Sequence, residues 1–164
     1  MGNNLVYLSF GSNIGDRLFY LNLAMEGIEK ELGRVVKSSS VYESEAWGFE
    51  AEPFLNQCVL IETKCDAMGL LERLQGIEKV AGRKVKHGKG YVSRELDIDI
   101  LFFNDRVVEE KGLSVPHPLL QERMFVLAPL NEIASGFVHP LLNKTVKELY
   151  ANCGEKDKTS VRKI

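Results

Sequence analysis

Hydrophobic positions in the first part of the chain switch between runs typical of strands and a stripe typical of a helix. Residues 5–10 form a short apolar run, residues 35–42 are rich in valine and serine, and residues 55–63 have strong β-propensity, so each segment predicts a strand. Between the first two strands, apolar side chains recur at helical spacing. That stripe consists of Leu18, Leu21, Met25, Ile28 and Leu32. Asp16 can cap this helix, and Gly33 can end it.

The pattern then repeats with a second helix and a further strand. Asp66 predicts the start of this helix and Gly82 its end. Its apolar stripe consists of Leu70, Leu71, Leu74, Ile77 and Ala81. Residues 95–103 are the most strand-like segment of the chain, and a turn signal at residues 104–105 precedes a short strand over residues 106–109.

The predicted order of elements is β-α-β-β-α-β, which favours an α+β fold. This order is typical of a ferredoxin-like sandwich, in which two helices cover one face of a mostly antiparallel sheet. The sequence from residue 116 onward predicts extra C-terminal short helices packed around the edge, of which residues 144–151 are the clearest. Residues 155–164 are charged, so we expect this tail to fray.

Composition excludes several classes of protein. The 164 residues contain 45% hydrophobic and 27% charged residues, and neither a repeat nor a linker divides them, so a single domain over residues 1–164 is expected. The net charge of −2 disfavours a generally basic nucleic-acid binder. No apolar run is long enough to predict a membrane span. The N-terminus does not have the pattern of a signal peptide. The three cysteines form no CxxC pair, so we expect reduced thiols in a cytoplasmic protein. We also expect the protein to be a monomer.

Two acidic residues in the last strong strand are the sharpest chemical feature. Asp97 and Asp99 are two positions apart, so they share one face with Cα atoms about 7 Å apart. Alternation predicts that this face continues with Leu101 and Phe103. The opposite face is predicted to carry Leu96, Ile98, Ile100 and Phe102. A hard cation such as Mg²⁺ would relieve the repulsion between two such carboxylates, although a solvated strand end or pairing with arginines remains an alternative.

A basic loop leads directly into the two aspartates. Residues 83–94 hold six basic side chains and no acidic one, namely Arg83, Lys84, Lys86, His87, Lys89 and Arg94. Cations that close over a metal-bound polyanion suit phosphoryl transfer, whereas the plain alternative is a solvated charged surface. The sequence lacks the GxxxxGK[ST] motif, which excludes a P-loop enzyme.

Aromatic and amide side chains elsewhere suggest a second substrate. Phe54 and Phe125 could sandwich a flat heterocycle, and Asn56 could read its hydrogen-bonding edge. Each has an ordinary alternative, since the two phenylalanines could be core residues and Asn56 a turn residue. His117, between two prolines, could simply bond the loop backbone.

Taken together, these motifs make the chain similar to a known family. They read YLSFGSN at residues 7–13, VYES at 41–44, FLN at 54–56, QGIE at 75–78, RELDIDIL at 94–101, VPHP at 115–118 and RMFVLAPL at 123–130. In this order the chain resembles the 6-hydroxymethyl-7,8-dihydropterin pyrophosphokinases of folate biosynthesis, over nearly its whole length. The resemblance implies transfer of pyrophosphate from ATP to the hydroxymethyl group of the pterin, with release of AMP.

The resemblance also implies roles for individual residues. Asp97 and Asp99 would hold two Mg²⁺ ions, and Arg83 and Arg94 would contact the phosphates as catalytic residues. The implied ATP-binding residues are Gln75, Glu78, Lys86, Lys89, Ile100, Ser114, His117 and Arg123. The implied pterin-binding residues are Gly11, Ser44, Glu45, Ala46, Trp47, Phe54, Asn56 and Phe125.

The basic loop departs from the family pattern. Many members have Trp-Gly-Pro-Arg before the second loop arginine, where this chain has GYVS at residues 90–93. Lys86 and Lys89 are therefore expected to supply the missing positive charge. No separate general base stands out, and Asp97 is the nearest candidate.

Two other functions remain open from the residues alone. A ferredoxin-like domain can be a small-molecule sensor without catalysis, because a fold does not fix a function. A metal-dependent nuclease or nucleotidyltransferase could use the same pair of aspartates. The acidic net charge and the single basic loop disfavour a long polyanion as its substrate.

Overall fold

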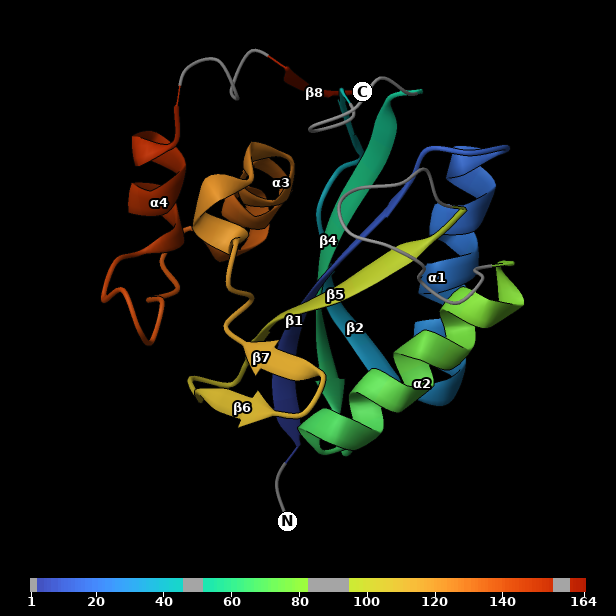
Figure 1. Ribbon diagram of the computed structural model, residues 1–164, viewed down its shortest axis with the longest axis horizontal. Coiled ribbons are helices and arrows are strands. Elements are labelled where there is room, and N and C mark those ends of the chain that lie inside the picture. Colours follow the sequence, from blue (N-terminus) through green and yellow to red (C-terminus); the bar gives the residue numbers. More distant parts are fainter. Residues whose placement is uncertain (1–2, 46–51, 83–94, 155–159) are drawn as a thin grey trace.

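A computed structural model describes residues 3–45, 52–82, 95–154 and 160–164. In chain order its elements are β1 (Asn4–Ser12), α1 (Arg17–Glu31), β2 (Gly33–Ser38), β3 (Tyr42–Ser44), β4 (Phe54–Thr63), α2 (Ala67–Val80), β5 (Asp97–Phe103), β6 (Val108–Glu110), β7 (Leu113–Val115), the 3₁₀ helix η1 (Leu120–Glu122), α3 (Met124–Ala134), α4 (Val146–Asn152) and β8 (Val161–Lys163). Figure 1 shows their arrangement around one twisted sheet.

The main sheet confirms the ferredoxin-like prediction. Its strand order is β5-β1-β4-β3-β8, β2 also pairs with β4, and every pairing is antiparallel. The expected strand over residues 35–42 is interrupted and forms β2 and β3. The reason lies at Ser39, whose Oγ accepts a hydrogen bond from the backbone N–H of Cys58 on β4 (3.0 Å). The Ser39 side chain therefore occupies a backbone N–H that would otherwise pair with a neighbouring strand, and the strand is interrupted here.

Local signals set the ends of the two predicted helices. Asp16 Oδ1 accepts from the backbone N–H of Phe19 (3.0 Å), and Asp66 Oδ1 accepts from that of Gly69 (2.7 Å), so both predicted caps are confirmed. Gly33 follows α1 and begins β2. A Cβ atom there would lie 2.0 Å from the carbonyl oxygen of Glu62, so the close approach of β2 to β4 requires glycine.

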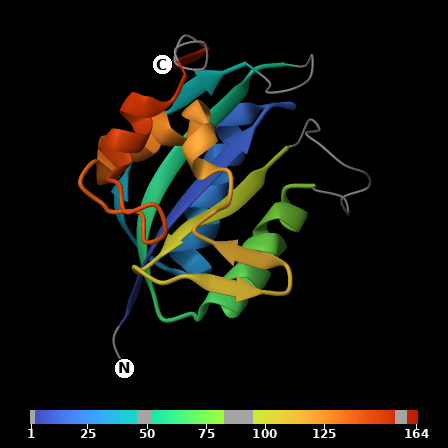
Figure 2. The same ribbon diagram turned by 60° about the vertical axis from the view of Figure 1, so that its left-hand side comes forward.

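The two faces of the sheet carry separate cores. Helices α1 and α2 cover one face and enclose a cluster that includes Leu8, Ile28 and Leu74. Helix α3 lies against the other face with α4 packed on it, over a cluster that includes Phe102 and Leu127. Figure 2 shows these helix pairs on opposite sides of the sheet. The expected C-terminal short helices are present as α3 and α4, but α3 builds a second core on a face of the sheet instead of packing around its edge.

The prediction for the faces of the last residues of β5 was wrong, because the strand contains a bulge. Leu8 pairs with Ile100 and Tyr7 with Phe102, so the register shifts and leaves Leu101 as an extra residue. Leu101 and Phe102 consequently pack in the second core, whereas Phe103 packs in the first. Before the bulge, alternation holds and keeps the two aspartates on the face opposite α1 and α2.

The C-terminal residues are more ordered than their composition predicts. The expectation of a frayed tail is wrong for Val161–Lys163, which form β8 and pair with β3, while residues 155–159 lie outside the described residues. The short strand expected over residues 106–109 is β6, and it pairs with β7 as a separate hairpin.

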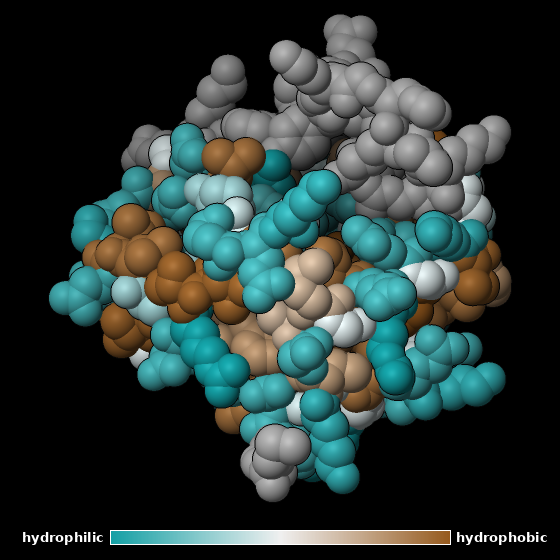
Figure 3. Space-filling view, turned by 60° about the horizontal axis from the view of Figure 1, so that its bottom comes forward, coloured by the Kyte–Doolittle hydropathy of each residue, from teal (hydrophilic) through white to brown (hydrophobic). Residues whose placement is uncertain are grey.

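The surface is mixed in polarity. Exposed apolar side chains include Leu5, Leu18, Phe19, Val80 and Leu141. On the side seen in Figure 3, hydrophobic patches are interrupted by hydrophilic residues. Within the described part of the chain, none of the helices combines the length and the apolarity that a membrane span requires.

Candidate active site

The two aspartates lie at the start of β5, where two cavities meet. Both residues line a smaller cavity on the face of the sheet that α3 covers, and both also line a larger groove beside α2. The larger groove has a volume of about 930 Å³, which is at the upper end for ligand sites. Groups bound in the two cavities would therefore meet at Asp97 and Asp99.

The smaller cavity brings together the described residues expected to bind the heterocycle. All of them line it, from β1, β4, α3 and the end of β3: Gly11, Ser44, Glu45, Phe54, Asn56 and Phe125. The residues Ala46 and Trp47, also expected there, lie outside the described residues.

Asn56 is held in place by its neighbours on both sides. It is buried, and its Nδ2 donates to Ser44 Oγ on β3 (2.7 Å). Gly11 is its cross-strand partner on β1, and a Cβ atom at residue 11 would lie 2.8 Å from Asn56 Oδ1. The glycine thus leaves room for the amide oxygen, which is the acceptor that a ligand edge could use.

We expect Gly11→Ala to reduce affinity for the heterocycle about tenfold, because the new methyl group must displace the Asn56 amide. Affinity for the nucleotide should stay unchanged, since Gly11 does not line the larger groove. Titration of each ligand separately would check this. Gly76→Ala is the matched control, because a Cβ atom there meets no neighbour within 4 Å. Equal losses in both variants would contradict the prediction.

The larger groove collects the described residues expected near the nucleotide, with one exception. Gln75, Glu78, Ile100, Ser114 and His117 all line it together with the two aspartates. His117 Nδ1 accepts from the backbone N–H of Leu119 (3.2 Å), so its neutral ring carries the proton on Nε2, which can donate to an anion.

Glu78 has a structural contact that the sequence does not indicate. Its carboxylate is buried on α2, and Oε2 accepts from the backbone N–H of Ile98 (2.9 Å). β5 is an edge strand, and Ile98 lies between the two aspartates. Glu78 therefore ties α2 to the segment of β5 that carries them, in addition to lining the groove.

Arg123 is the exception among the expected ATP-binding residues. It lines the smaller cavity, with its guanidinium 5.7 Å from the ring centre of Phe125. Burial lowers the pKa of Arg123 to about 10, so it stays charged at neutral pH. A fixed cation therefore shares this cavity with the two aspartates.

Four basic residues that the sequence places at the phosphates lie outside the described residues: Arg83, Lys86, Lys89 and Arg94. Conversely, the structure adds two residues that the sequence did not single out. Ser9 pairs with Asp99 across the sheet and lines the smaller cavity, and Lys79 lines the larger groove. The spacing of Lys79, four residues after Gln75 on the same helix, is the signal that could have found it.

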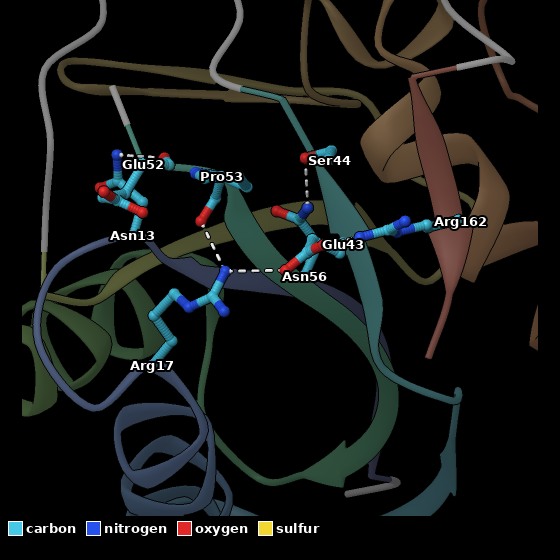
Figure 4. A network of polar contacts seen from close by, with 8 residues as sticks. All are labelled: Asn13, Arg17, Glu43, Ser44, Glu52, Pro53, Asn56 and Arg162. Carbon is cyan, nitrogen blue, oxygen red and sulfur yellow. Dashed lines mark hydrogen bonds and ion pairs between the residues drawn. The ribbon is translucent and has the colours of Figure 1, made fainter. Parts of the chain in front are cut away.

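A polar network braces the rim of the smaller cavity (Figure 4). Glu43 on β3 accepts from Arg17 Nη1 (3.1 Å) and from Arg162 Nη2 (2.6 Å). Arg17 Nη1 also donates to the carbonyl oxygen of Pro53 (2.9 Å), and Asn13 Nδ2 donates to that of Glu52 (3.1 Å). The contacts join α1, β3, β8 and the segment before β4.

This network should make stability depend on pH. Hydrogen bonds from Arg162 and Arg17 hold the pKa of Glu43 below its ordinary value of 4.5. A lowered folded pKa gives stability that is present above the ordinary value and is lost as pH falls through the folded one. We expect Glu43→Gln to cost about 1 kcal/mol near neutral pH, and the difference from the wild type to vanish in acid. Urea unfolding at both pH values would check this, and a constant difference would contradict it.

Asp97 and Asp99 fit the ligands that Mg²⁺ uses. Both are partly exposed at the cavity walls. Among the residues with described positions, no group of three or more His, Cys, Asp or Glu side chains could hold a metal ion. Two carboxylates, with phosphate oxygens and water completing the shell, are the usual protein contribution to a Mg²⁺ site at a nucleotide.

The fold, and two cavities that meet at a pair of aspartates, are the arrangement expected of a group-transfer enzyme with two small substrates. A profile of the 7,8-dihydro-6-hydroxymethylpterin-pyrophosphokinase (HPPK) family matches residues 7–135. The chain therefore belongs to this family, and it is a pyrophosphokinase of folate biosynthesis.

Individual relatives agree with this assignment. The 2-amino-4-hydroxy-6-hydroxymethyldihydropteridine pyrophosphokinase of Aquifex aeolicus is 44% identical over 144 residues, covering 87% of this chain and 88% of the relative. The folic acid synthesis protein FOL1 of Dictyostelium discoideum is 36% identical over 152 residues, covering 92% of this chain and 23% of its own length. The crystal structure of an HPPK-DHPS in complex with substrates supports the fold, with a TM-score of 0.83 at 16% identity; the match covers 99% of this chain and about half (47%) of that one.

Proposed function

We propose that the chain transfers the β,γ-pyrophosphoryl group of Mg-ATP to the hydroxymethyl oxygen of 6-hydroxymethyl-7,8-dihydropterin and releases AMP. The observation that carries the proposal is the place of Asp97 and Asp99, which border the larger groove and the smaller cavity alike. A transfer between two bound molecules needs such a meeting point, because reacting groups held together avoid the entropic cost of a bimolecular encounter.

The lining of each cavity supports the placement of the substrates. The pterin would lie in the smaller cavity, with Phe54 and Phe125 available to its ring and Asn56 to its amide edge. The nucleotide would occupy the larger groove along α2, where His117 and Lys79 offer donors to phosphate oxygens.

Asp97 and Asp99 would hold Mg²⁺ between these two substrates. Bound there, the metal would supply charge neutralisation for the phosphates and would make the substrate hydroxyl more acidic. We expect two ions, from the family pattern of the paired aspartates.

The protein's own groups would orient the reaction. The hydroxymethyl oxygen forms a bond to the β-phosphorus, the bond from that phosphorus to the α-phosphate oxygen breaks, and AMP leaves. We assign the proton of the hydroxyl to Asp97. Arg123, a partly buried cation that lines the same cavity as the aspartates, would stabilise negative charge that develops on the transferred group.

The identity of the nucleotide product tests the proposal. Purified protein would be mixed with Mg-ATP, with and without the pterin, and the nucleotides separated by chromatography. We expect AMP in a one-to-one ratio with pterin diphosphate, only when the pterin is present. ADP would mean transfer of a single phosphoryl group, and pterin binding without any turnover would favour a sensor; either result would overturn the proposal.

A further inference from the structure

The strand that carries Ser44 is too short to hold its position alone. β3 has three residues and lies between β4 and β8 in the sheet. On one side Ser44 pairs with Phe54, and on the other with Val161. Both Ser44 and Phe54 line the smaller cavity, and Ser44 also accepts the hydrogen bond from Asn56.

We propose that the C-terminal strand β8 is a positioning element for the pterin site, acting through its pairing with β3 and through the ion pair of Arg162 with Glu43. The inference rests on the proposed function. It also goes beyond the family match, because the matched residues end at 135 and β8 begins at 161.

Backbone contacts extend the β8 pairing beyond both ends of β3. The backbone N–H of Ile164 donates to the carbonyl oxygen of Val41 (3.1 Å), and that of Glu45 donates to Ser160 (3.4 Å). Without β8, β3 would be a three-residue edge strand with one row of backbone groups open to water. Glu45, the residue directly after β3, itself lines the smaller cavity.

Charged side chains fasten β8 at two further points. Arg162 Nη2 lies 2.6 Å from Glu43 Oε1, while Arg17 from α1 holds the other oxygen of the same carboxylate at 3.1 Å. Lys163 Nζ lies 3.5 Å from Oε1 of Glu132 on α3, which also accepts from the Ser40 hydroxyl (2.8 Å). β3 is thus clamped between α1, α3 and β8, and Arg162 is the residue of β8 that pairs with a carboxylate of β3 itself.

Arg162 lies where it can position the pterin site but cannot contact a ligand in the smaller cavity. Its side chain is 76% exposed, and it does not line the smaller cavity. An effect of Arg162 on pterin affinity must therefore pass through Glu43 and β3 to Ser44 and Asn56. The nucleotide groove shares none of these residues, so its affinity provides an internal reference.

The test uses the full chain with Arg162→Ala, Arg162→Glu and Arg162→Lys, and a variant that lacks residues 160–164. The probe is 6-hydroxymethyl-7,8-dihydropterin, titrated by fluorescence with Mg²⁺ and an α,β-methylene analogue of ATP that blocks transfer. Arg34→Ala is the matched control, since Arg34 forms a comparable exposed pair with Glu62 on neighbouring strands (3.7 Å).

We expect the pterin dissociation constant to rise about threefold in Arg162→Ala and about tenfold in Arg162→Glu and in the shortened chain. Arg162→Lys should restore most of the affinity, the control should match the wild type, and the nucleotide dissociation constant should stay within about twofold throughout. Pterin affinities equal to the wild type in Arg162→Glu would overturn the inference, as would equal losses for both ligands. If the shortened chain does not fold, the exposed point variants decide. A wild type that binds no pterin at all would instead overturn the proposed function.

Discussion

Asp97→Ala is expected to lower pterin-dependent AMP formation by about a thousandfold or more, with both substrates still bound. Asp97 borders both cavities, and under the proposed function its loss would remove a Mg²⁺ ligand at the point of transfer and, with it, several kcal/mol of charge stabilisation. Single-turnover measurement of AMP at saturating Mg-ATP would report this loss. Asp97→Asn should lose nearly as much, because an amide keeps the shape of the side chain but not its charge.

Two other aspartates, one in β5 and one in the turn after it, provide the comparisons for Asp97→Ala. Asp105 is an exposed aspartate in the turn after the same strand, so Asp105→Ala should keep full activity. Asp99→Ala should resemble Asp97→Ala, and the double variant should be little worse than either, because groups that hold one metal site act as a unit. Activity in Asp97→Ala within about tenfold of the wild type would contradict a role of this strand in the transfer.

The site shows which parts of its geometry were local enough to predict from the sequence. That Asp97 and Asp99 share a face follows from strand alternation alone, and the caps at Asp16 and Asp66 depend on residues within three positions. The meeting of two cavities at the aspartates does not follow, because it requires β5 to lie between β1 and α2. Local sequence patterns predict the helices and strands, but tertiary packing decides which of them lie side by side.

The predictions that were wrong or incomplete also depend on contacts between elements that are far apart in the sequence. The bulge at Leu101 depends on how Tyr7 and Leu8 of β1 meet β5, which no periodicity within residues 95–103 contains. The charged tail has weak local preference for a strand, yet Val161–Lys163 form one because β3 offers an open edge and Glu43 attracts Arg162. Resemblance placed Glu78 at the nucleotide, but its bond to the N–H of Ile98 depends on β5 being an edge strand.

Two of the buried polar residues that line the smaller cavity explain how the site can be rigid before ligands bind. Asn56 and Ser44 bond each other across β3 and β4, and the clamp on Glu43 holds β3 from the side away from the cavity. A prepositioned amide loses little further freedom on binding, so its hydrogen bond contributes more to affinity. The arrangement also fixes which amide atom remains for a ligand: Nδ2 donates to Ser44, and Oδ1 lies over Gly11.

Asn56→Ala is therefore expected to lower kcat/KM for the pterin about a hundredfold, because a site built to hydrogen-bond its ligand loses far more than a nonspecific contact. KM for Mg-ATP should stay near the wild-type value, since Asn56 is absent from the lining of the larger groove. Steady-state kinetics with each substrate varied in turn would separate the two effects.

Gln57→Ala is the matched control for Asn56→Ala. Gln57 is the neighbouring amide on β4, it points to the other face, and its Nε2 donates to the carbonyl oxygen of Ser39 (2.8 Å). Both variants remove one amide hydrogen bond from the same strand, so a general loss of stability would affect them alike. A fall in kcat/KM confined to Asn56→Ala assigns the amide to pterin recognition. Similar falls in both variants, or an equal rise in KM for both substrates, would instead make Asn56 a structural residue of the sheet.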